Sequence, residues 1–275
     1  MEQTQIKVPK TRWHRLLGKM FEELLTPVGI EVYPEFPVMA GPPEADILLL
    51  RRETPQWTPE QMQRLPDGIR DSRADHILIE FKYTESAGLP AFRQSVGYDY
   101  FYKISKKLTD RHVHTFLVSS KTVADKTLAR FGYSQADKSG VNHSRYPLLD
   151  AVSLLTLNDL SDEPHNAYIK CFASRMQVKK AAFKILDDLN IGSVSHRLVW
   201  FLQGLLKYWF SKGGVLMQQE LTPEQVMEDG KLWGDFFLKN ISVEERLKGL
   251  KPEERLKGMS VQEIEAYLRK LKEEK

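Results

Sequence analysis

The chain has 275 residues, 41% of them hydrophobic and 28% charged, which is enough for a substantial core in one large domain or in a main domain with an appendage. Its formal net charge of +3 permits a polyanionic partner without indicating one. The single cysteine, Cys171, excludes an internal disulfide and a thiolate zinc cluster. Because neither a signal-type apolar core nor a membrane-spanning run is present, we expect a cytoplasmic protein with no membrane partner.

The first predicted element is an amphipathic helix over residues 12–26, where apolar residues recur at helical spacing. Pro27 and Gly29 end this helix. Two carboxylates, Glu22 and Glu23, lie beside the apolar stripe. The periodicity does not decide which of the two, if either, faces a cleft, and a pair of solvated helix charges is an equally good interpretation.

Three strands are predicted next. Residues 30–38 alternate like a half-exposed strand whose prolines suit a sheet edge, and residues 46–51 form a buried strand with Asp46 at its entrance. The proline-rich segment 53–72, with one short helical piece, is typical of an excursion between two strands that then pair. Residues 75–83 form the third strand, because their apolar run is short, β-branched and aromatic.

This third strand carries two charges within its apolar run. Because side chains alternate between faces, Glu80 and Lys82 point to one side and Phe81 to the other. Such charges are costly unless they are paired, bound to a metal or open to a cleft. If the two buried strands pair, Asp46 and Glu80 converge, and with the carbonyl of Phe81 they suit Mg²⁺ beside a phosphate. Lys82 would then orient or deprotonate the attacking water, so the set predicts phosphodiester hydrolysis.

The remaining elements complete an α/β pattern. A helix over 88–107 and a strand over 113–119 follow, and the order strand, helix, strand implies a parallel crossover. A further strand is predicted at 152–157. Helices then occupy 163–174, 177–189 and 195–210, before a charged helical tail with two copies of Glu-Glu-Arg-Leu-Lys-Gly. The expected parts are a core over 1–160, a helical part packed on it over 161–240, and a tail over 241–275 that could join copies into a homo-oligomer.

These motifs resemble the PD-(D/E)XK nuclease superfamily, in which an acid on a helix is followed by an aspartate that opens one strand and by Glu-x-Lys that closes the next. The matching residues are, in chain order, Glu22, Asp46, Glu80, Phe81 and Lys82. Gly18 favours Glu22 over Glu23, because a glycine four residues earlier on the same helix face would let the backbone approach the strands. Ala45 stands where the superfamily usually has a proline, a change that removes no ligand.

A second motif narrows the resemblance. Gln94 and Tyr98 are similar to the Gln-x-x-x-Tyr step of the RecB-like branch, and the helical continuation with its repetitive tail is similar to recombination-promoting and transposase-like nucleases. The resemblance implies a restriction-endonuclease-like fold and Mg²⁺-dependent DNA cleavage with little sequence specificity, Mn²⁺ substituting for Mg²⁺. The roles it implies are metal binding by Asp46, Glu80 and Phe81, with Glu22 acting through water, and catalysis by Asp46, Glu80, Lys82, Gln94 and Tyr98.

Two other interpretations of the site residues stay open. A nuclease-like fold could bind nucleic acid or a protein without cutting, and in a small-molecule domain Glu80 and Lys82 would merely pair with each other.

His112 and His114, with no third ligand nearby, indicate a surface pair rather than a zinc site. The basic residues of the later elements are interpreted as solvated faces rather than as a phosphate track: Lys103, Lys106, Lys107, Arg111, Lys179, Lys180 and Lys184.

Overall fold

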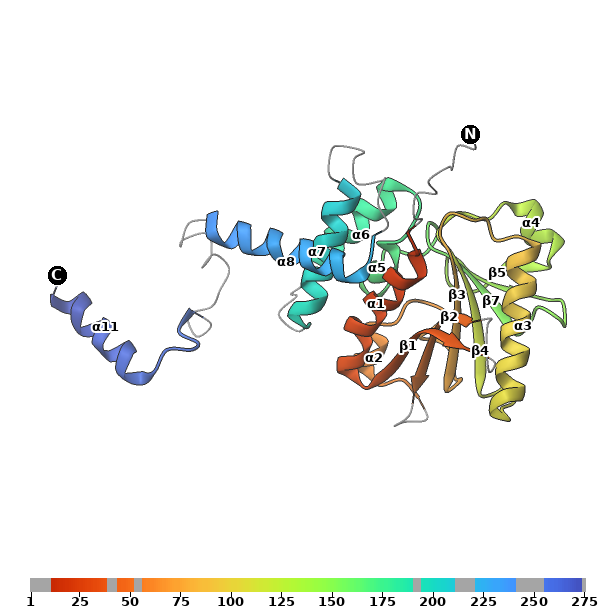
Figure 1. Cartoon of the computed structure of the whole chain (residues 1–275), viewed down its shortest axis with the longest axis horizontal. Helices are drawn as coiled ribbons and strands as arrows, with labels where there is room; N and C mark the ends of the chain where they lie inside the picture. Colours follow the sequence, from red (N-terminus) through yellow and green to blue (C-terminus); the bar gives the residue numbers. More distant parts are fainter. Residues whose placement is uncertain are drawn as a thin grey trace, which may run out of the picture. The chain divides into compact units, whose positions relative to one another are not determined.

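The computed structural model describes residues 11–38, 44–51, 56–189, 194–210, 221–240 and 255–273, which form an α/β protein (Figure 1). At its centre lies a seven-stranded mixed sheet flanked by helices, with the strand order β1-β2-β3-β4-β7-β6-β5. The strands are β1 (Ile30–Pro37), β2 (Glu44–Arg51), β3 (His76–Lys82), β4 (Val113–Ser119), β5 (Tyr133–Gln135), β6 (Val141–Ser144) and β7 (Val152–Thr156). The predicted α/β class with a mixed sheet is confirmed.

The helices predicted from the sequence are present within a few residues of their expected bounds. The described helical elements are α1 (Trp13–Leu25), η1 (Thr26–Val28), α2 (Pro59–Met62), α3 (Leu89–Lys106), α4 (Asp125–Arg130), α5 (Pro164–Lys170), α6 (Met176–Asp188), α7 (His196–Phe210), α8 (Pro223–Asn240) and α11 (Val261–Glu273). Ser195 caps α7, because its Oγ accepts a hydrogen bond of 3.2 Å from the Leu198 N–H. None of the described helices is long and apolar enough to cross a membrane.

The strand pairing follows the pattern expected from the connections. β1 pairs with β2 and β2 with β3 in antiparallel fashion, whereas β3, β4 and β7 are parallel neighbours. Helix α3 makes the predicted parallel crossover from β3 to β4, and β1, with its two prolines, lies at the sheet edge. The short antiparallel strands β5 and β6 were not predicted, because elements of three and four residues carry no periodic pattern.

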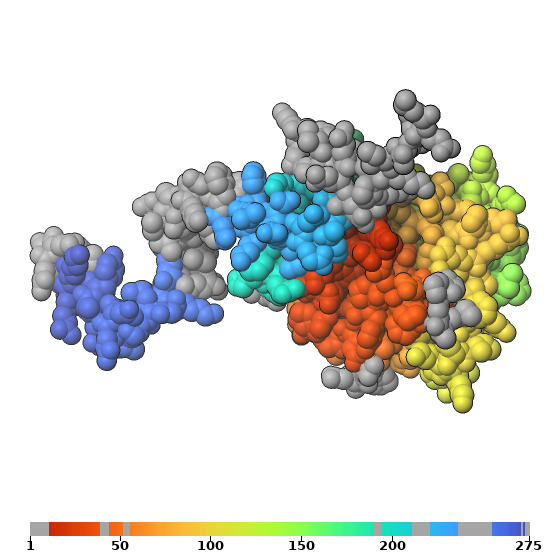
Figure 2. All heavy atoms as spheres, viewed as in Figure 1, coloured from red at the N-terminus to blue at the C-terminus, as the bar shows by residue number. Residues whose placement is uncertain are grey.

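The two faces of the sheet pack against different helices. Ile77, Ile79 and Phe81 of β3 belong to a core with apolar residues of α1, α5, α6 and α7, whereas Leu78 belongs to a smaller core with residues of α3. The alternation of side chains therefore places Glu80 and Lys82 on the α3 side of the sheet and Phe81 on the α1 side. In Figure 2 the atoms of α1, in red, and of α3, in yellow, flank those of the strands between them.

A buried polar contact joins the segment between β2 and β3 to the later helices. Asp67 is 1% exposed and accepts hydrogen bonds from Asn166 Nδ2 at 2.7 Å and His165 Nε2 at 2.9 Å. Arg197 of α7 also donates to Glu23 of α1, at 2.9 Å. The helices α5 to α7 thus share the core of the sheet.

Contacts divide the chain into the units Met1–Lys231 and Leu232–Lys275. The first repeat of the tail lies outside the described residues.

Candidate active site

Two carboxylates meet where β2 begins and β3 ends. The antiparallel register pairs Ile47 with Ile79, so the next step along the ladder sets Asp46 opposite Glu80. The Phe81 N–H donates a hydrogen bond of 2.7 Å to Asp46 Oδ2. The convergence expected of these two strands is therefore present, and it arises from the antiparallel register of two buried strands.

Lys82 lies between an acid of its own strand and an amide of the next helix. Its Nζ donates to Glu80 Oε1 at 2.7 Å and to Gln94 Oε1 at 3.1 Å. Gln94 Nε2 in turn donates to the Tyr98 hydroxyl at 2.8 Å. The structure thus brings together the strand and helix residues that the sequence singled out, in one chain of hydrogen bonds from β3 to α3.

The two carboxylates are held in an environment that disfavours their charged forms. Burial raises the pKa of Asp46 to about 6, against the effect of the Phe81 N–H. Burial, together with the charge of Asp46, raises the pKa of Glu80 to about 7, although Lys82 acts in the opposite direction. Glu80 is 2% exposed, and its Oε2 atom is buried with no hydrogen-bond partner. A buried oxygen of this kind is costly unless a ligand satisfies it.

The carboxylates open to a cavity of about 330 Å³. Its lining residues come from the start of α1, from β2, from the end of β3 and from α3: Thr11, Arg12, Trp13, His14, Asp46, Glu80, Phe81, Lys82, Tyr83, Thr84, Glu85 and Gln94. Because the lining includes carboxylates, basic side chains and aromatic rings, the cavity suits a charged ligand with a planar part.

Sequence reasoning missed two residues next to Asp46. His14 Nδ1 lies 3.7 Å from Asp46 Oδ1, and His14 Nε2 lies 3.2 Å from Glu35 Oε1. Arg15 also donates to Glu35, at 2.8 Å, and this contact, working against burial, keeps the pKa of Glu35 below its usual value. Glu35 has a φ of 52°, a strained conformation for a residue other than glycine. No sequence pattern marks either residue, because their contact depends on how α1 crosses β1.

The structure does not bring Glu22 into this group. Glu22 is absent from the cavity lining, and its Oε2 pairs with Lys19 at 2.8 Å with 44% of the side chain exposed. The reason is its place on α1, two helical turns beyond His14 and so roughly 12 Å further along the axis. Gly18 does allow close packing, since an added Cβ would meet Pro34 at 3.0 Å. That contact draws α1 onto β1 and leaves Glu22 at a distance from the carboxylates.

The residues present fit a hard divalent cation. In the part of the chain that the structure describes, no group of three or more His, Cys, Asp and Glu side chains is arranged as a metal site. Asp46 and Glu80 nevertheless supply two converging carboxylates, and the unpartnered Oε2 of Glu80 is a free oxygen ligand. Ions such as Mg²⁺ need only one or two protein carboxylates, because they retain waters and bind substrate phosphates.

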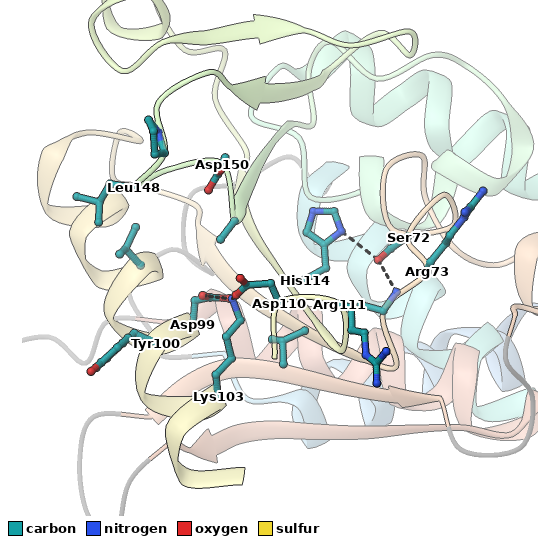
Figure 3. A pocket seen from close by; sticks show the side chains of 15 residues that line it. Ser72, Arg73, Asp99, Tyr100, Lys103, Asp110, Arg111, His114, Leu148 and Asp150 are labelled. Carbon is teal, nitrogen blue, oxygen red and sulfur yellow. Dashed lines mark hydrogen bonds and ion pairs between the residues drawn. The ribbon is translucent and has the colours of Figure 1, made fainter. Parts of the chain in front are cut away.

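A second cavity lies at the other end of β4 (Figure 3). His114 lines it and is half-buried, with its ring nitrogens 3.0 and 2.7 Å from the hydroxyls of Ser72 and Ser153. Lys103, 9% exposed, also lines this cavity, and Lys179, 3% exposed, lies elsewhere under α7; neither belongs to a solvated face. His112 is half-buried, and the other predicted basic residues are exposed: Lys106, Lys107, Arg111, Lys180 and Lys184.

Comparisons with known proteins do not identify a function. No family model matches the chain, and no curated protein or solved structure matches it. The case for any activity therefore rests on the residues of the site.

Proposed function

We propose that the chain is a divalent-metal-dependent DNA endonuclease with a restriction-endonuclease-like core. The observation that carries this proposal is the meeting of Asp46, Glu80 and Lys82 at one cavity, with a buried carboxylate oxygen left unpartnered. Two converging carboxylates can hold a metal ion, and the ammonium of a lysine on the same strand as one of them can stabilise negative charge. These are the groups that suit phosphodiester hydrolysis. The proposed reaction is hydrolysis of the DNA backbone with little sequence specificity.

Asp46 and Glu80 would hold the cation, together with the main-chain carbonyl of Phe81. The peptide before Phe81 is already held by its N–H bond to Asp46, so the strand end would need little rearrangement. Mg²⁺, or Mn²⁺ in its place, would supply charge to the phosphate oxygens and lower the pKa of water. Glu22, which lies away from this cavity, is assigned no direct contact in the proposal.

Lys82 is suited to stabilise negative charge at the phosphate. Although burial acts against the ammonium form, the neighbouring Glu80 and Asp46 carboxylates hold the pKa of Lys82 above its ordinary value. A lysine that keeps its proton orients the attacking water and balances the charge that develops on phosphorus-bound oxygens. Gln94 holds Lys82 in place, and Tyr98 holds Gln94, so these two act as positioning residues.

The topology supports the restriction-endonuclease-like assignment. Asp46 opens a strand antiparallel to β3, Lys82 closes β3, and the chain then crosses through α3 to the parallel strand β4. Helix α1 covers one face of these strands and α3 the other. The order of α1, Asp46 at the start of β2, Lys82 at the end of β3 and then α3 follows the order of motifs in the superfamily that the sequence resembles.

A second candidate is a nuclease-like fold that binds nucleic acid or a protein without cutting it. The direct contact of 2.7 Å between Lys82 and Glu80 favours this alternative, because the pair satisfies one carboxylate oxygen without a metal. The distance of Glu22 from the cavity favours it too. The alternative predicts DNA binding that does not change when Lys82 is replaced.

Nicking of supercoiled plasmid tests the two candidates. The full chain is incubated with Mg²⁺, Mn²⁺ or chelator, alongside Glu80→Gln, Lys82→Met and the control Lys126→Met, an exposed lysine of α4. We expect metal-dependent nicking that falls about 10²-fold in Lys82→Met, as loss of a charge-stabilising group should cause, and stays unchanged in Lys126→Met. Equal nicking by all proteins would indicate a contaminant, and DNA binding without nicking would favour the silent fold.

A further inference from the structure

Three aromatic rings from distant parts of the chain meet beside the carboxylates. Trp13 of α1 stacks on Tyr83, which follows β3, with ring centroids 4.1 Å apart and planes at 26°. Trp209 of α7 lies near-parallel to both rings, 5.2 Å from Trp13 and 5.7 Å from Tyr83. Trp13 and Tyr83 line the same cavity as Asp46 and Glu80. The wall of the candidate active site is therefore aromatic on the α1 side.

The rings do not form a closed column. If Trp13 lay between the other two rings, Tyr83 and Trp209 would be separated by far more than their 5.7 Å. The three centroids instead form a triangle, and both Trp13 and Tyr83 keep part of their surface exposed at the cavity. Core rings of this protein, such as Phe116 and Phe172, are fully buried. The difference indicates that part of the aromatic surface faces whatever occupies the site.

The cluster is held rigidly from behind. Ser120 Oγ donates to the Tyr83 carbonyl at 2.5 Å, and Lys179 Nζ donates to the Tyr83 hydroxyl at 2.8 Å. The same ammonium lies 3.2 Å from the centroid of the Trp209 ring, which is a close cation–π contact. Lys179 is 3% exposed, so it supports the rings and does not itself meet a ligand. Rings fixed in this way lose little entropy when a planar ligand stacks on them.

Resting on the nuclease function proposed above, we propose that Trp13 and Tyr83 bind an unpaired base of the strand that is cut, so that single-stranded DNA is the preferred substrate. Aromatic rings that can stack on a base line the same cavity as the carboxylates proposed to hold a metal ion beside a phosphate. This combination favours a nucleotide of a nucleic acid as the ligand. Bases within a duplex have both faces covered by their neighbours, so only an unpaired base offers a free face. Arg12 and Lys82, which also line the cavity, add positive charge for the backbone.

Binding measured without cleavage tests this inference. Fluorescently labelled single-stranded oligothymidine and a duplex of equal length are titrated with the full chain in chelator, so that nothing is cut. We expect the single strand to bind about tenfold more tightly than the duplex, and Trp13→Leu to weaken single-strand binding about tenfold while leaving duplex binding unchanged, as loss of one base stack should do. Tyr100→Leu, an exposed aromatic residue of α3 at the other cavity, should change neither.

Two further variants separate stacking from folding. Trp13→Phe keeps an aromatic face and should retain most single-strand binding, and Tyr83→Phe, which loses only the hydroxyl bonded to Lys179, should retain it too. The preference of the wild-type chain needs no variant at all. Equal binding of single strand and duplex by the wild type, or equal weakening of both by Trp13→Leu, would overturn the inference.

The outcome is separable from that of the nuclease proposal. Trp13-dependent binding of single strands by a chain that cuts no DNA would support the stacking inference and overturn the nuclease. Metal-dependent nicking of duplex plasmid by a chain with no preference for single strands would do the reverse. In the active enzyme, an abasic position moved along a single-stranded substrate should reduce cleavage about tenfold at one register only, where the missing base would have met Trp13.

Discussion

Two polar cavities lie at opposite ends of the parallel strands β3 and β4, and they differ in how their buried charged side chains are paired. The larger, of about 600 Å³, lies where β4 begins, and its buried lysine is paired: Lys103 donates to Asp99 at 2.5 Å and to Asp110 at 2.7 Å (Figure 3). The smaller, of about 330 Å³, contains Glu80, whose buried Oε2 has no partner. The comparison teaches that the unsatisfied buried atom, and not the volume of a cavity, indicates where a ligand is needed.

The largest expected effect is on nicking activity, which should depend on Lys82 and not on Lys103. Lys82→Met should reduce metal-dependent nicking about 10²-fold, because it removes the cation beside the phosphate. Lys103→Met should leave nicking per folded molecule unchanged, because its ammonium pairs with Asp99 and Asp110 at the other end of the strands. The measurement is the initial rate of plasmid nicking, scaled by the folded fraction from circular dichroism. Comparable losses in the two variants would contradict the division of roles.

Stability should respond more strongly in the larger cavity. Lys103→Met leaves Asp99, 6% exposed, without its ammonium, and we expect the free energy of unfolding to fall by about 3 kcal/mol, as for a broken buried ion pair. Urea unfolding at pH 7 measures the change. Adding Asp99→Asn to the same chain should restore part of the loss, because the stranded charge is then gone. A single variant as stable as the wild type would show that the pair is solvated.

The pH dependence of stability should depend on His114. Burial lowers the pKa of His114 to about 4, whereas an unfolded histidine takes up a proton near 6.5. Its contribution to stability is therefore present above pH 6.5 and is lost as the pH falls toward 4. Between pH 6.5 and 5 the wild type should lose about 2 kcal/mol that His114→Gln does not lose. Titrating carboxylates affect both proteins equally, so they do not contribute to the difference between them. Free energies of unfolding, measured in urea, that change with pH in the same way in both proteins would refute this prediction.

The smallest effect is a gain in stability at the smaller cavity. Burial holds the pKa of Glu80 at about 7 in the folded chain, above its ordinary value, so ionisation of this residue costs the folded state stability at pH 8. Glu80→Gln removes that cost, and in chelator we expect the free energy of unfolding to rise by on the order of 1 kcal/mol. The gain should vanish below pH 4.5, where the carboxyl is protonated in both states. A loss of stability at pH 8 would mean that the contact with Lys82 outweighs burial.

The strands and the central site residues could be predicted because they depend on local pattern. An apolar run interrupted by Glu80 and Lys82 determines both the strand and the face of each charge, and the antiparallel neighbour then brings Asp46 to the same end. Gln94 faces Lys82 because α3 follows directly after β3. In each case the sequence separation is short or the periodicity is two.

The remaining features depend on how distant elements cross, which no pattern encodes. The helix 12–26 was predicted, but Glu22 lies outside the cavity lining, and His14, two turns earlier on α1, is the helix residue beside Asp46. The burial of Lys103 and Lys179 also escaped prediction, since lysines are rarely buried. Lys179 depends on a distant partner, Tyr83, whereas Lys103 is paired with the nearby Asp99 and Asp110. Glu35 was missed for the same reason.

The contact between Asp67 and Asn166 has a consequence for the order in which the molecule assembles. The two residues are 99 positions apart, and both are almost completely buried. A ribosome must release the chain beyond α5 before the loop that leads into β3 can be locked, and contacts of such long range are closed late. A nascent chain would therefore hold the segment between β2 and β3 without this contact until synthesis has passed α5.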